Sequence, residues 1–354
     1  MILITGSGGL IGYTASNFFL NKKFNVIGID NNMREKLFGK NSSVKDNILS
    51  LKKNKKYKHL NIDINNLKII YQVLQKKNVR LIVHAAGQPS HDWSALDPIS
   101  DFKINALSTL NLLEGVRKYS PKTIFIFLST NKVYGDYVNN FNYIEEKSRF
   151  IINIKKHKNF LNGFGENIPI DQSLHSPFGV SKISADIMTQ EYGKYYGLST
   201  ICLRAGCLTG ENHTGTELHG FLSYLFKCAF YGKKYFIYGY KGKQVRDNLS
   251  AYDVTKIIYE ILKKPPKCGE VYNIGGGIQS NISIIEAIKK IENILEKKIK
   301  YKYINKARKG DHIYWVTNMK KFKNNYPSWN INNTIDDILL KMYEYEKSTK
   351  SSSL

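Results

Sequence analysis

A glycine-rich turn near the N-terminus constrains the fold of this chain more than any other feature. An apolar run, Ile2–Thr5, precedes the turn at 6–12, and a helical pattern follows over Leu10–Leu20. Glycine stands at every third position of the turn: Gly6, Gly9 and Gly12. This spacing allows a tight strand-to-helix turn and close approach of the backbone to a pyrophosphate at the helix N-terminus. The turn therefore predicts a strand–turn–helix unit that binds a dinucleotide.

The next apolar run, Asn25–Asp30, ends in a carboxylate. Asp30 follows Gly12 by 18 residues, and an acidic residue at this place can accept hydrogen bonds from a ribose and would repel a 2′-phosphate. This favours NAD over NADP as the dinucleotide. Arg34 stands close by and leaves the NADP alternative open, because an arginine there can accommodate the 2′-phosphate.

Short apolar runs continue to alternate with amphipathic stretches further along the chain. Strands are predicted at Leu81–His84, Ile124–Leu128 and Thr200–Arg204, and helices at Ile104–Tyr119 and Pro177–Tyr196. Strands that alternate with helices in this way form parallel βαβ units. The sequence therefore predicts an α/β fold, a Rossmann-type doubly wound parallel sheet with a smaller mixed α/β substrate domain.

The pattern of strands and helices loosens after Gly206, and this indicates where the smaller domain begins. We expect the NAD-binding Rossmann domain to comprise residues 1–206 and about 236–262. The interleaved substrate domain is expected at about 207–235 and 263–345. Residues 346–354, which end in a serine-rich stretch, are expected to form a loose tail.

Composition bears on the partners and on the compartment. Lys and Arg number 53 against 29 Asp and Glu, a net charge of +24, but no basic block with interleaved aromatics is present, so we predict no nucleic-acid binding. The four cysteines form no C-x-x-C pair and have no His at ligand spacing, so no metal site is predicted. No apolar run approaches the ~20 residues of a membrane span, and no signal-peptide pattern precedes the first strand. We expect a cytoplasmic protein that binds no membrane.

Further motifs are spread along nearly the whole chain. They are Asp63-Ile64, His84-Ala85-Ala86-Gly87-Gln88, Ser129-Thr130, Val133-Tyr134-Gly135-Asp136, Ser181-Lys182, Arg204 and Arg246-Asp247. Together with the glycine turn they resemble the extended short-chain dehydrogenase/reductase superfamily, the NAD-dependent epimerases and dehydratases. The resemblance implies NAD as a bound cofactor that is regenerated in each turnover. The cofactor contacts that it implies are Gly6, Gly9, Leu10, Ile11, Gly12, Asp30, Asn31, Asp63, Ile64, Ala85, Ala86, Gly87, Asn105, Ser129 and Lys182.

Four segments resemble a narrower group within that family. The similarity to the epimerases that act at C2 of a CDP-linked sugar lies in Ser129–Asp136, His175-Ser176-Pro177, Ser181-Lys182 and Gly242–Asp247. The resemblance implies loss of a hydride from a sugar carbon to NAD, a transient keto sugar, and return of the hydride to the opposite face. Two alternatives stay open: a UDP-hexose 4-epimerase or other nucleotide-sugar modifying enzyme, and a catalytically impaired protein that binds NAD and a nucleotide sugar.

The catalytic residues depart from the family at one position. The family uses a hydroxyl residue, matched by Thr130, and a Tyr followed four residues later by a Lys, matched by Lys182. The Tyr position is Phe178, and a benzyl side chain cannot accept a proton. In the first of three accounts another group relays the proton: Thr130 through water, Lys182, His175, His91 or Cys207. In the second the protein turns over slowly or not at all, and in the third it performs a different reaction.

His175 is the relay candidate that we single out, because an imidazole is suited to proton transfer at neutral pH. Its alternative role is a helix-entry side chain that is hydrogen-bonded to the backbone. Asn131 and Lys132 stand where the 4,6-dehydratases of the family carry Asp and Glu, so the paired carboxylates for water elimination are lacking. Dehydratase chemistry is therefore not expected.

The resemblance also implies which residues contact the substrate. They are Gln88, His91, Thr130, Asn131, Arg204, Arg246 and Arg308. Guanidinium groups bind phosphate oxygens in pairs, which suits Arg246 and Arg308 to the diphosphate of a nucleotide sugar. An ion pair of Arg246 with Asp247 or Asp253 is the alternative. Members of the family commonly dimerise through two helices, here Asn105–Tyr119 and Pro177–Tyr196, so a homodimer is expected.

Overall fold

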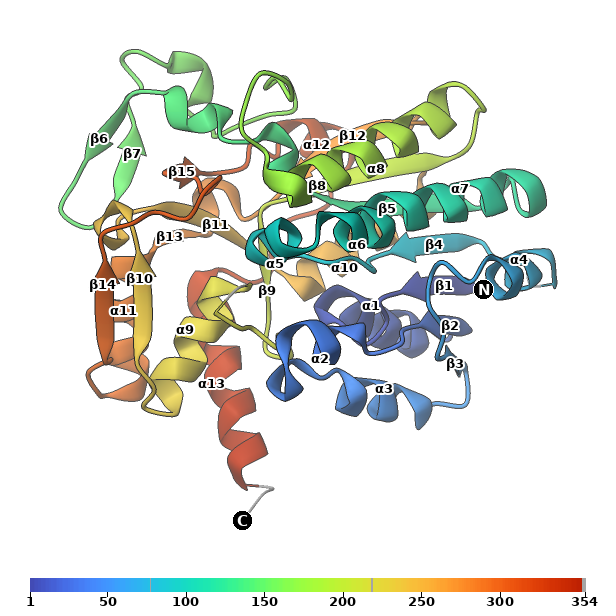
Figure 1. Ribbon diagram of the computed structural model, residues 1–354, viewed down its shortest axis with the longest axis horizontal. Helices are drawn as coiled ribbons and strands as arrows, with labels where there is room; N and C mark the ends of the chain where they lie inside the picture. The colour runs from blue at the N-terminus through green and yellow to red at the C-terminus, as the bar shows by residue number, and fades with distance from the viewer. Residues whose placement is uncertain (77, 218, 352–354) are drawn as a thin grey trace.

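Seven parallel strands form the central sheet in the computed structural model, which describes residues 1–76, 78–217 and 219–351. Their order is β12-β8-β5-β4-β1-β2-β3 (Figure 1). The strands are β1 (Ile2–Thr5), β2 (Val26–Ile29), β3 (Tyr57–Leu60), β4 (Leu81–His84), β5 (Ile124–Thr130), β8 (Thr200–Ala205) and β12 (Glu270–Ile274). The order reverses between β1 and β4, as it does in a doubly wound sheet. The predicted fold class is confirmed.

Helices cover both faces of this sheet because its strands are apolar on both sides. Successive side chains of a strand point to opposite faces, so Ile2 and Ile4 lie in one core and Leu3 lies in the other. The first core is covered by α1 (Leu10–Asn21), α3 (Lys45–Lys52), α10 (Ala251–Lys263) and α12 (Lys320–Asn325). The second is covered by α4 (Leu67–Lys76), α7 (Ser108–Tyr119) and α8 (Ser176–Lys194).

A second, smaller unit stands beside the carboxyl ends of the central strands (Figure 1). Its core lies between helices and a two-stranded parallel sheet: α9 (Phe221–Phe230), α11 (Ile284–Leu295), α13 (Ile335–Ser351), β10 (Tyr235–Tyr238) and β14 (Tyr301–Ile304). A four-stranded sheet links this unit to the first: β9 (Cys207–Thr209), β11 (Val245–Ser250), β13 (Asn281–Ser283) and β15 (Tyr314–Trp315).

The remaining elements are short. A hairpin of β6 (Tyr143–Glu145) and β7 (Phe150–Ile152) packs over a local aromatic core. Three short α-helices are α2 (Met33–Phe38), α5 (His91–Leu96) and α6 (Pro98–Phe102), and a π-helical turn, Lys103–Leu107, joins α6 to α7. Single 3-10 turns occur at Lys40–Ser42, Asn131–Tyr134, Tyr137–Asn140, Lys158–Phe160, Tyr240–Gly242 and Gly277–Gln279.

Strand membership differs from the predicted domain boundaries at two places. Residues 270–274 fall in the predicted substrate domain, but β12 is the edge strand of the central sheet and pairs with β8. Residues 236–238 fall in the predicted NAD-binding domain, but they belong to β10, which pairs with β14. The cause is tertiary: Tyr272 of β12 packs against Phe322 of α12 at a ring distance of 5.5 Å, a contact that the local pattern does not indicate.

Most of the predicted loose tail is helical, because α13 continues to Ser351. The Glu346 carboxylate is buried; it accepts a hydrogen bond of 2.7 Å from the Tyr231 hydroxyl and lies 3.8 Å from the Lys227 ammonium. These contacts hold the end of α13 beside α9, and residues 352–354 lie outside the described part of the chain. No helix within the described ranges has both the length and the apolar character that a membrane crossing requires.

Candidate active site

A cavity of about 520 Å³ opens at the carboxyl ends of the central strands and extends to the smaller unit. One end, the glycine-turn half, is lined by Gly6–Gly12, Asp30, Asp63-Ile64 and Ala85–Gly87. The other end, the arginine half, is lined by Lys132, Arg246, Arg308, Gly310 and Asp311. Thr130, Phe178 and Lys182 line the cavity between them. The chain thus joins both predicted sets of contacts in one space.

Two glycines of the turn are dictated by geometry. Gly6 has a φ of +66°, and a Cβ there would stand 2.8 Å from the backbone nitrogen of Ala86. A Cβ on Gly12 would collide with the carbonyl group of Gly6. The glycines therefore let β1, α1 and the end of β4 meet closely. Gly9 caps α1 without a side chain, so the first N–H groups of the helix are available to an anion.

Asp30 is held just beyond β2 at the edge of the cavity. Its two carboxylate oxygens accept hydrogen bonds from the backbone N–H groups of Gly8, at 2.9 Å, and Asn32, at 2.8 Å. Asn31 donates from its amide to the Asp63 carboxylate at 3.5 Å. A carboxylate has further acceptor sites after two such bonds. Asp30 is thus a fixed acceptor beside the glycine turn, as a ribose contact requires.

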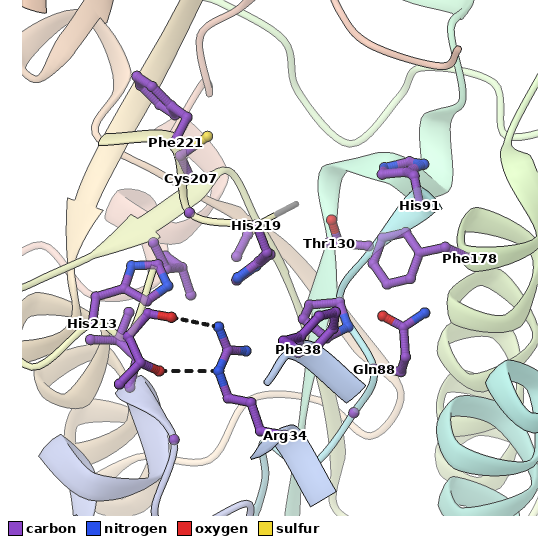
Figure 2. Close-up of a pocket in the computed structure, with 18 of the residues that line it drawn as sticks. Arg34, Phe38, Gln88, His91, Thr130, Phe178, Cys207, His213, His219 and Phe221 are labelled. Carbon is purple, nitrogen blue, oxygen red and sulfur yellow. Dashed lines mark hydrogen bonds between the residues drawn. The ribbon is translucent and has the colours of Figure 1, made fainter. Parts of the chain in front are cut away.

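Arg34 is directed away from Asp30 and toward the far wall of the cavity. Its guanidinium donates to the Thr214 hydroxyl at 3.1 Å and to the Thr214 carbonyl at 2.8 Å, across the cavity (Figure 2). Burial lowers its pKa to about 10, and the charge of Asp30 opposes this shift. These two bonds engage the Arg34 guanidinium with Thr214.

The Ala85–Gly87 turn follows β4, and hydrogen bonds to the buried side chain of Asn105 hold the residue after it, Gln88. Asn105 is buried; its amide oxygen accepts from the Gln88 N–H at 2.9 Å, and its NH₂ group donates to the Ser181 hydroxyl at 3.0 Å. Asn105 does not line the cavity. The predicted cofactor contact of Asn105 is therefore not supported, and this residue instead positions the turn that faces the cavity.

The end of β5 brings Ser129, Thr130 and Asn131 to the cavity. Ser129 donates its hydroxyl proton to the Asp186 carboxylate at 2.5 Å, so that hydroxyl is engaged with the protein core. The Thr130 hydroxyl accepts from the Lys132 N–H at 3.2 Å, and its side chain lies beside Phe178 (Figure 2). Thr130 therefore lines the cavity between its two halves, next to Phe178.

Phe178 and Lys182 stand one turn apart on α8. The Lys182 ammonium donates to the Leu128 carbonyl at 2.8 Å, and burial lowers its pKa to about 8. Phe178 is 6% exposed and places its ring 4.9 Å from the ring of His91. Phe178, the residue predicted to stand at the family's tyrosine position, thus lines the cavity one helical turn before Lys182.

The two candidate histidines lie in different surroundings. His175 precedes α8 and does not line the cavity; its Nε2 lies 3.1 Å from the Val133 carbonyl. This is the helix-entry role, and the structure does not support proton relay by His175. His91 begins α5 and lines the cavity, with its Nδ1 2.7 Å from the Ser176 hydroxyl.

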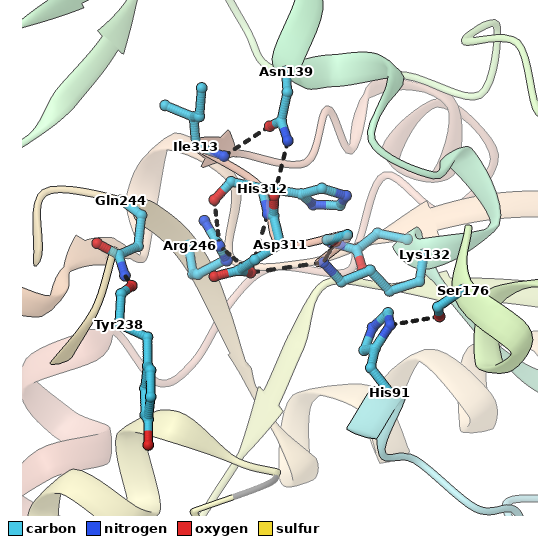
Figure 3. A network of polar contacts seen from close by, with 12 residues as sticks. His91, Lys132, Asn139, Ser176, Tyr238, Gln244, Arg246, Asp311, His312 and Ile313 are labelled. Carbon is cyan, nitrogen blue, oxygen red and sulfur yellow. Dashed lines mark hydrogen bonds and ion pairs between the residues drawn. The ribbon is translucent and has the colours of Figure 1, made fainter. Parts of the chain in front are cut away.

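An ion-pair network forms the arginine half (Figure 3). The Arg246 guanidinium lies 2.5 Å from the Asp311 carboxylate, and the Lys132 ammonium lies 3.8 Å from it and donates to the Gly310 carbonyl at 2.9 Å. Arg246 and Lys132 hold the pKa of Asp311 well below its usual range. Burial lowers the pKa of Lys132 to about 8. Two cations and one carboxylate leave net positive charge, which suits a phosphate ligand.

The partner of Arg246 differs from the predicted alternatives. Asp247 points elsewhere and accepts from the backbone N–H groups of Gly277 and Thr317 at 3.0 and 2.9 Å. Asp253 accepts from Ser250 at the start of α10. Asp311, 65 residues away from Arg246, takes their place. The motif Arg308-Lys309-Gly310-Asp311, which contains Asp311, was the only feature of the sequence that pointed to this region.

The other two predicted arginines have different fates. Arg204 does not line the cavity; it is buried in a bidentate pair with Asp186, at 3.0 and 2.8 Å, and donates to the Tyr134 hydroxyl at 3.0 Å. The predicted substrate contact of Arg204 is therefore replaced by a structural role. Arg308 does line the cavity and lies 4.4 Å from the centre of the Tyr238 ring.

Two histidines of the 209–220 segment, the buried His213 and the partly buried His219, were not among the predicted contacts. His213 and His219 line the cavity opposite Phe178 and have a ring distance of 5.5 Å (Figure 2). Their Nδ1 atoms have no hydrogen-bond partner in the described part of the chain. Burial keeps both pKa values below the usual range, so both rings are neutral at pH 7. Only their position in the cavity marks them, since the sequence pattern around them is irregular.

The sheet, the glycine turn and the cavity together define a class of protein, the α/β enzymes that bind a dinucleotide across the carboxyl edge of a doubly wound sheet. The NAD dependent epimerase/dehydratase family matches residues 2–275, and the chain belongs to this family. The CDP-paratose 2-epimerase of Salmonella typhi is 31% identical over 98% of this chain and 99% of its own. The UDP-glucuronate 4-epimerase of Thermodesulfobacterium geofontis is 25% identical over 93% of this chain and 92% of its own.

A solved structure extends the similarity to the whole fold. The dTDP-glucose 4,6-dehydratase of Bacillus anthracis, in complex with NAD, superposes with a TM-score of 0.76 at 25% identity. The superposition covers 99% of this chain and 97% of that one. The predicted family and enzyme class are confirmed.

NAD is the cofactor of this family, and the residues present fit it. The space kept free of a Cβ at Gly12, the open N-terminus of α1 and the fixed carboxylate of Asp30 are what a pyrophosphate and an adenosine ribose require. Ala85–Gly87 and Lys182 continue this path toward Thr130. The prediction of NAD is confirmed.

Proposed function

We propose that this enzyme is an NAD-dependent nucleoside-diphosphate-sugar epimerase that inverts C2 of a CDP-linked sugar through a transient keto sugar. The observation that carries the proposal is one continuous cavity that connects the glycine turn, Thr130 and Lys182 with the cations of the arginine half. The similarity to a CDP-paratose 2-epimerase along nearly the full length of both chains supports the choice of base and carbon.

The residues between the two halves would hold the reacting sugar. NAD, when bound, supplies the hydride acceptor and returns the hydride later in the same turnover. The Lys182 ammonium, fixed by the Leu128 carbonyl, would hold the cofactor's ribose and keep positive charge beside the reacting carbon. The Thr130 hydroxyl would contact the sugar oxygen. Inversion then requires the keto sugar to turn within the cavity while its diphosphate stays bound.

The arginine half would hold that diphosphate. Arg246 and Lys132 converge on Asp311, and Arg308 lines the same wall. Asp311 orients Arg246 and keeps its fork at the edge of the cavity, where a guanidinium can bind two phosphate oxygens. Asn131 and Lys132 offer no carboxylate for water elimination, which supports epimerisation over dehydration.

A second candidate rests on Phe178. A benzyl ring in the place of the family's phenol supports the hypothesis of a protein that binds NAD and a nucleotide sugar but turns over slowly. The similarity to a UDP-glucuronate 4-epimerase also keeps inversion at C4 of a UDP-hexose as a candidate reaction.

One experiment separates these candidates. The purified protein is incubated with NAD and, in turn, CDP-, UDP-, GDP- and dTDP-sugars that carry deuterium at C2 or at C4, and the products are followed by NMR. We expect inversion at C2 of a CDP-sugar, with deuterium retained because the same hydride returns. Inversion at C4 of a UDP-hexose would contradict the proposal, and binding without any inversion would favour the slow binding protein.

We also infer a homodimer formed by α7, α8 and the short helices beside them. These helices pack against one another, and their outer surfaces are apolar. The exposed apolar side chains are Leu96, Ile99, Phe102, Leu107, Val180, Ile187, Tyr195 and Tyr196. A patch of this kind marks a protein–protein contact. Light scattering is expected to give twice the chain mass, and Val180→Glu with Ile187→Glu is expected to give the single-chain mass.

The compartment and the remaining partners also stay proposals. We place the enzyme in the cytoplasm, where its NAD and nucleotide-sugar ligands are made, and propose no nucleic-acid or membrane partner. The lysines are spread along the chain and form no basic block, which supports the absence of a nucleic-acid partner. Retention of an oligonucleotide through high salt would contradict it, because electrostatic binding to nucleic acid weakens steeply with salt.

A further inference from the structure

His91 is the imidazole that stands beside the benzyl ring of Phe178. Its ring is in edge contact with Phe178 at 4.9 Å and 65°, and both side chains line the cavity next to Thr130 (Figure 2). Gly310 of the arginine half lies on its other side, since a Cβ on Gly310 would stand 3.9 Å from Nδ1 of His91. His91 therefore lies between the proposed diphosphate site and the place of the family's phenol.

One nitrogen of His91 is anchored and the other is not. Nδ1 lies 2.7 Å from the hydroxyl of Ser176, as the dashed line in Figure 3 shows. Nε2 has no hydrogen-bond partner in the described part of the chain. A ring that donates its Nδ1–H to an oxygen carries a lone pair on Nε2, and this tautomer can accept a proton there.

The backbone of Ser176 is strained in a way that serves this contact. Its φ is +62°, in the left-handed region that residues other than glycine seldom occupy. Its hydroxyl also lies 3.4 Å from the Gly179 N–H, at the first turn of α8. Strained residues of this kind cluster at functional sites, where the surrounding structure holds them. In this conformation the Ser176 hydroxyl lies within hydrogen-bond distance of His91.

The other relay candidates are engaged elsewhere. The Lys182 ammonium donates to the Leu128 carbonyl, and the Lys132 ammonium donates to the Gly310 carbonyl. The pKa of the Cys207 thiol is raised to about 11 by burial, so it is not ionised at neutral pH. His175 faces the backbone outside the cavity. Among the relay candidates predicted from the sequence, His91 is the imidazole that lines the cavity, and it lies beside Phe178. His213 and His219 line the opposite wall (Figure 2).

We infer that His91, positioned by Ser176, replaces the missing phenol as the proton acceptor of this enzyme. The inference rests on the proposed function. As the sugar C–H bond releases its hydride to NAD, the hydroxyl O–H bond breaks, a new N–H bond forms on Nε2, and the carbon–oxygen bond becomes a carbonyl. When the hydride returns to the opposite face, the proton moves from Nε2 back to the oxygen. Atoms and charge balance over the turnover.

Burial and the neighbouring charges keep the His91 ring neutral before the reaction. Burial lowers its pKa to about 3, with Lys132 and Arg308 acting in the same direction and Asp311 opposing them. The ring is therefore unprotonated at neutral pH, which is the form that accepts a proton. Loss of a hydride makes the hydroxyl proton strongly acidic, so an acceptor of low basicity suffices.

The test compares His91→Asn with the parent chain. Asn can keep the contact to Ser176 but has no basic nitrogen. Turnover is expected to fall 10²–10⁴-fold, the range that general acid–base groups contribute, while the Kd values for NAD and for the nucleotide sugar, measured by calorimetry, change less than threefold. His157→Asn, just before the 3-10 turn Lys158–Phe160 and outside the cavity, is the matched control and is expected to turn over like the parent.

Rescue distinguishes proton acceptance from a packing role. Phe178→Tyr in the His91→Asn background supplies a phenol one turn before Lys182 and is expected to restore turnover at least tenfold. Ser176→Ala is expected to lower kcat severalfold and to change the pH profile of kcat, with KM unchanged. Circular dichroism checks that each variant is folded. If His91→Asn does not fold, His91→Gln replaces it in the same measurements.

The outcomes separate this inference from the proposed function. A parent chain that inverts no nucleotide sugar overturns both. A parent chain that inverts its sugar while folded His91→Asn keeps turnover within threefold overturns only the role of His91. A His91→Asn variant that is slow but is not rescued by Phe178→Tyr, and that also loses sugar affinity, shows a binding role and overturns proton acceptance.

Discussion

The two halves of the cavity are built in different ways. The glycine-turn half is made of backbone: Gly6 and Gly12 are fixed by close approaches to neighbouring main chain, and Asp30 is held by two backbone N–H groups. The arginine half is made of side chains, with Arg246 and Lys132 gathered around Asp311. A substitution in the glycine-turn half displaces the main chain, so we expect nearly complete loss of ligand binding. A substitution in the arginine half removes one charged side chain, so we expect a partial loss of ligand affinity. The predictions below test this contrast.

Gly12→Ala is expected to have the largest effect. Its Cβ would collide with the carbonyl of Gly6, so the turn must open and the phosphate site is lost. NAD affinity is expected to fall more than a thousandfold, measured by calorimetry or by fluorescence of bound NADH. Gly165→Ala, where the nearest atom to the new Cβ is at 3.4 Å, is the control. NAD binding by folded Gly12→Ala near the parent level would contradict the backbone description.

Arg204→Gln is expected to lower stability and to spare the ligands. Removing one partner of a buried ion pair leaves Asp186 uncompensated, at a cost of about 3–5 kcal/mol of unfolding free energy. Urea denaturation gives this value, and nucleotide-sugar affinity is measured on the folded fraction. Arg117→Gln removes a surface pair with Glu114 and is expected to leave the unfolding free energy nearly unchanged, because solvent screens exposed ion pairs. A large loss of sugar affinity with unchanged stability would restore Arg204 as a substrate contact.

Arg246→Ala is expected to weaken binding of the nucleotide sugar and not of NAD. Hydrogen bonds between charged groups contribute about 1.5–3 kcal/mol each, so nucleotide-sugar affinity is expected to fall about 10–150-fold, with NAD affinity unchanged. Calorimetry with each ligand measures both. Arg149→Ala breaks a pair with Glu286 away from the cavity and serves as the control. Equal losses of both affinities would show that the two halves are not independent.

Lys182→Met is expected to have the smallest effect on stability and a distinctive pH dependence. The folded pKa of Lys182 is about 8, below its ordinary 10.5. Between these values the unfolded chain holds a proton that the folded chain lacks, so this group makes unfolding free energy rise with pH across that window. At pH 7 its buried charge is a penalty, and the Met variant is expected to be up to about 3 kcal/mol more stable, less the lost hydrogen bond to Leu128.

The pH dependence supplies the check on Lys182. The advantage of Lys182→Met is expected to narrow as the pH is raised from 7 to 9.5 in urea denaturation. Lys194→Met, on the exposed side of the same helix, is expected to show no such change. An advantage that is constant with pH would mean that packing, not charge, sets the difference.

The same contrast explains how far the sequence alone could go. The glycine turn, Asp30 and the strands around them follow from residues close together in the chain, and these predictions agree with the structure. Arg204, Asn105 and His175 match family motifs, but their roles are decided by partners elsewhere: Asp186, Gln88 and the Val133 carbonyl. A motif fixes which residue is present, not which atoms it faces.

Two kinds of contact could not be predicted from local pattern. The pair of Lys132 with Asp311 and the contact of His91 with Ser176 join segments that are far apart in the chain, and only the packing of the two units brings them together. The end of α13 is helical because Glu346 is held by Tyr231, although a serine-rich ending is typical of a loose tail. Residues 270–274 were likewise assigned to the substrate domain from the local pattern, whereas β12 pairs with β8 in the central sheet.

Helix α8 has one further consequence. Its inner side carries Phe178 and Lys182, and its outer side exposes Val180 and Ile187. Because a helix moves as a rigid body, a contact on the outer side of α8 that tilts the helix also moves Phe178 and Lys182 on its inner side. If a second copy of the chain grips that outer side, specific activity should depend on enzyme concentration, declining on dilution as the two copies come apart and recovering when the solution is concentrated again.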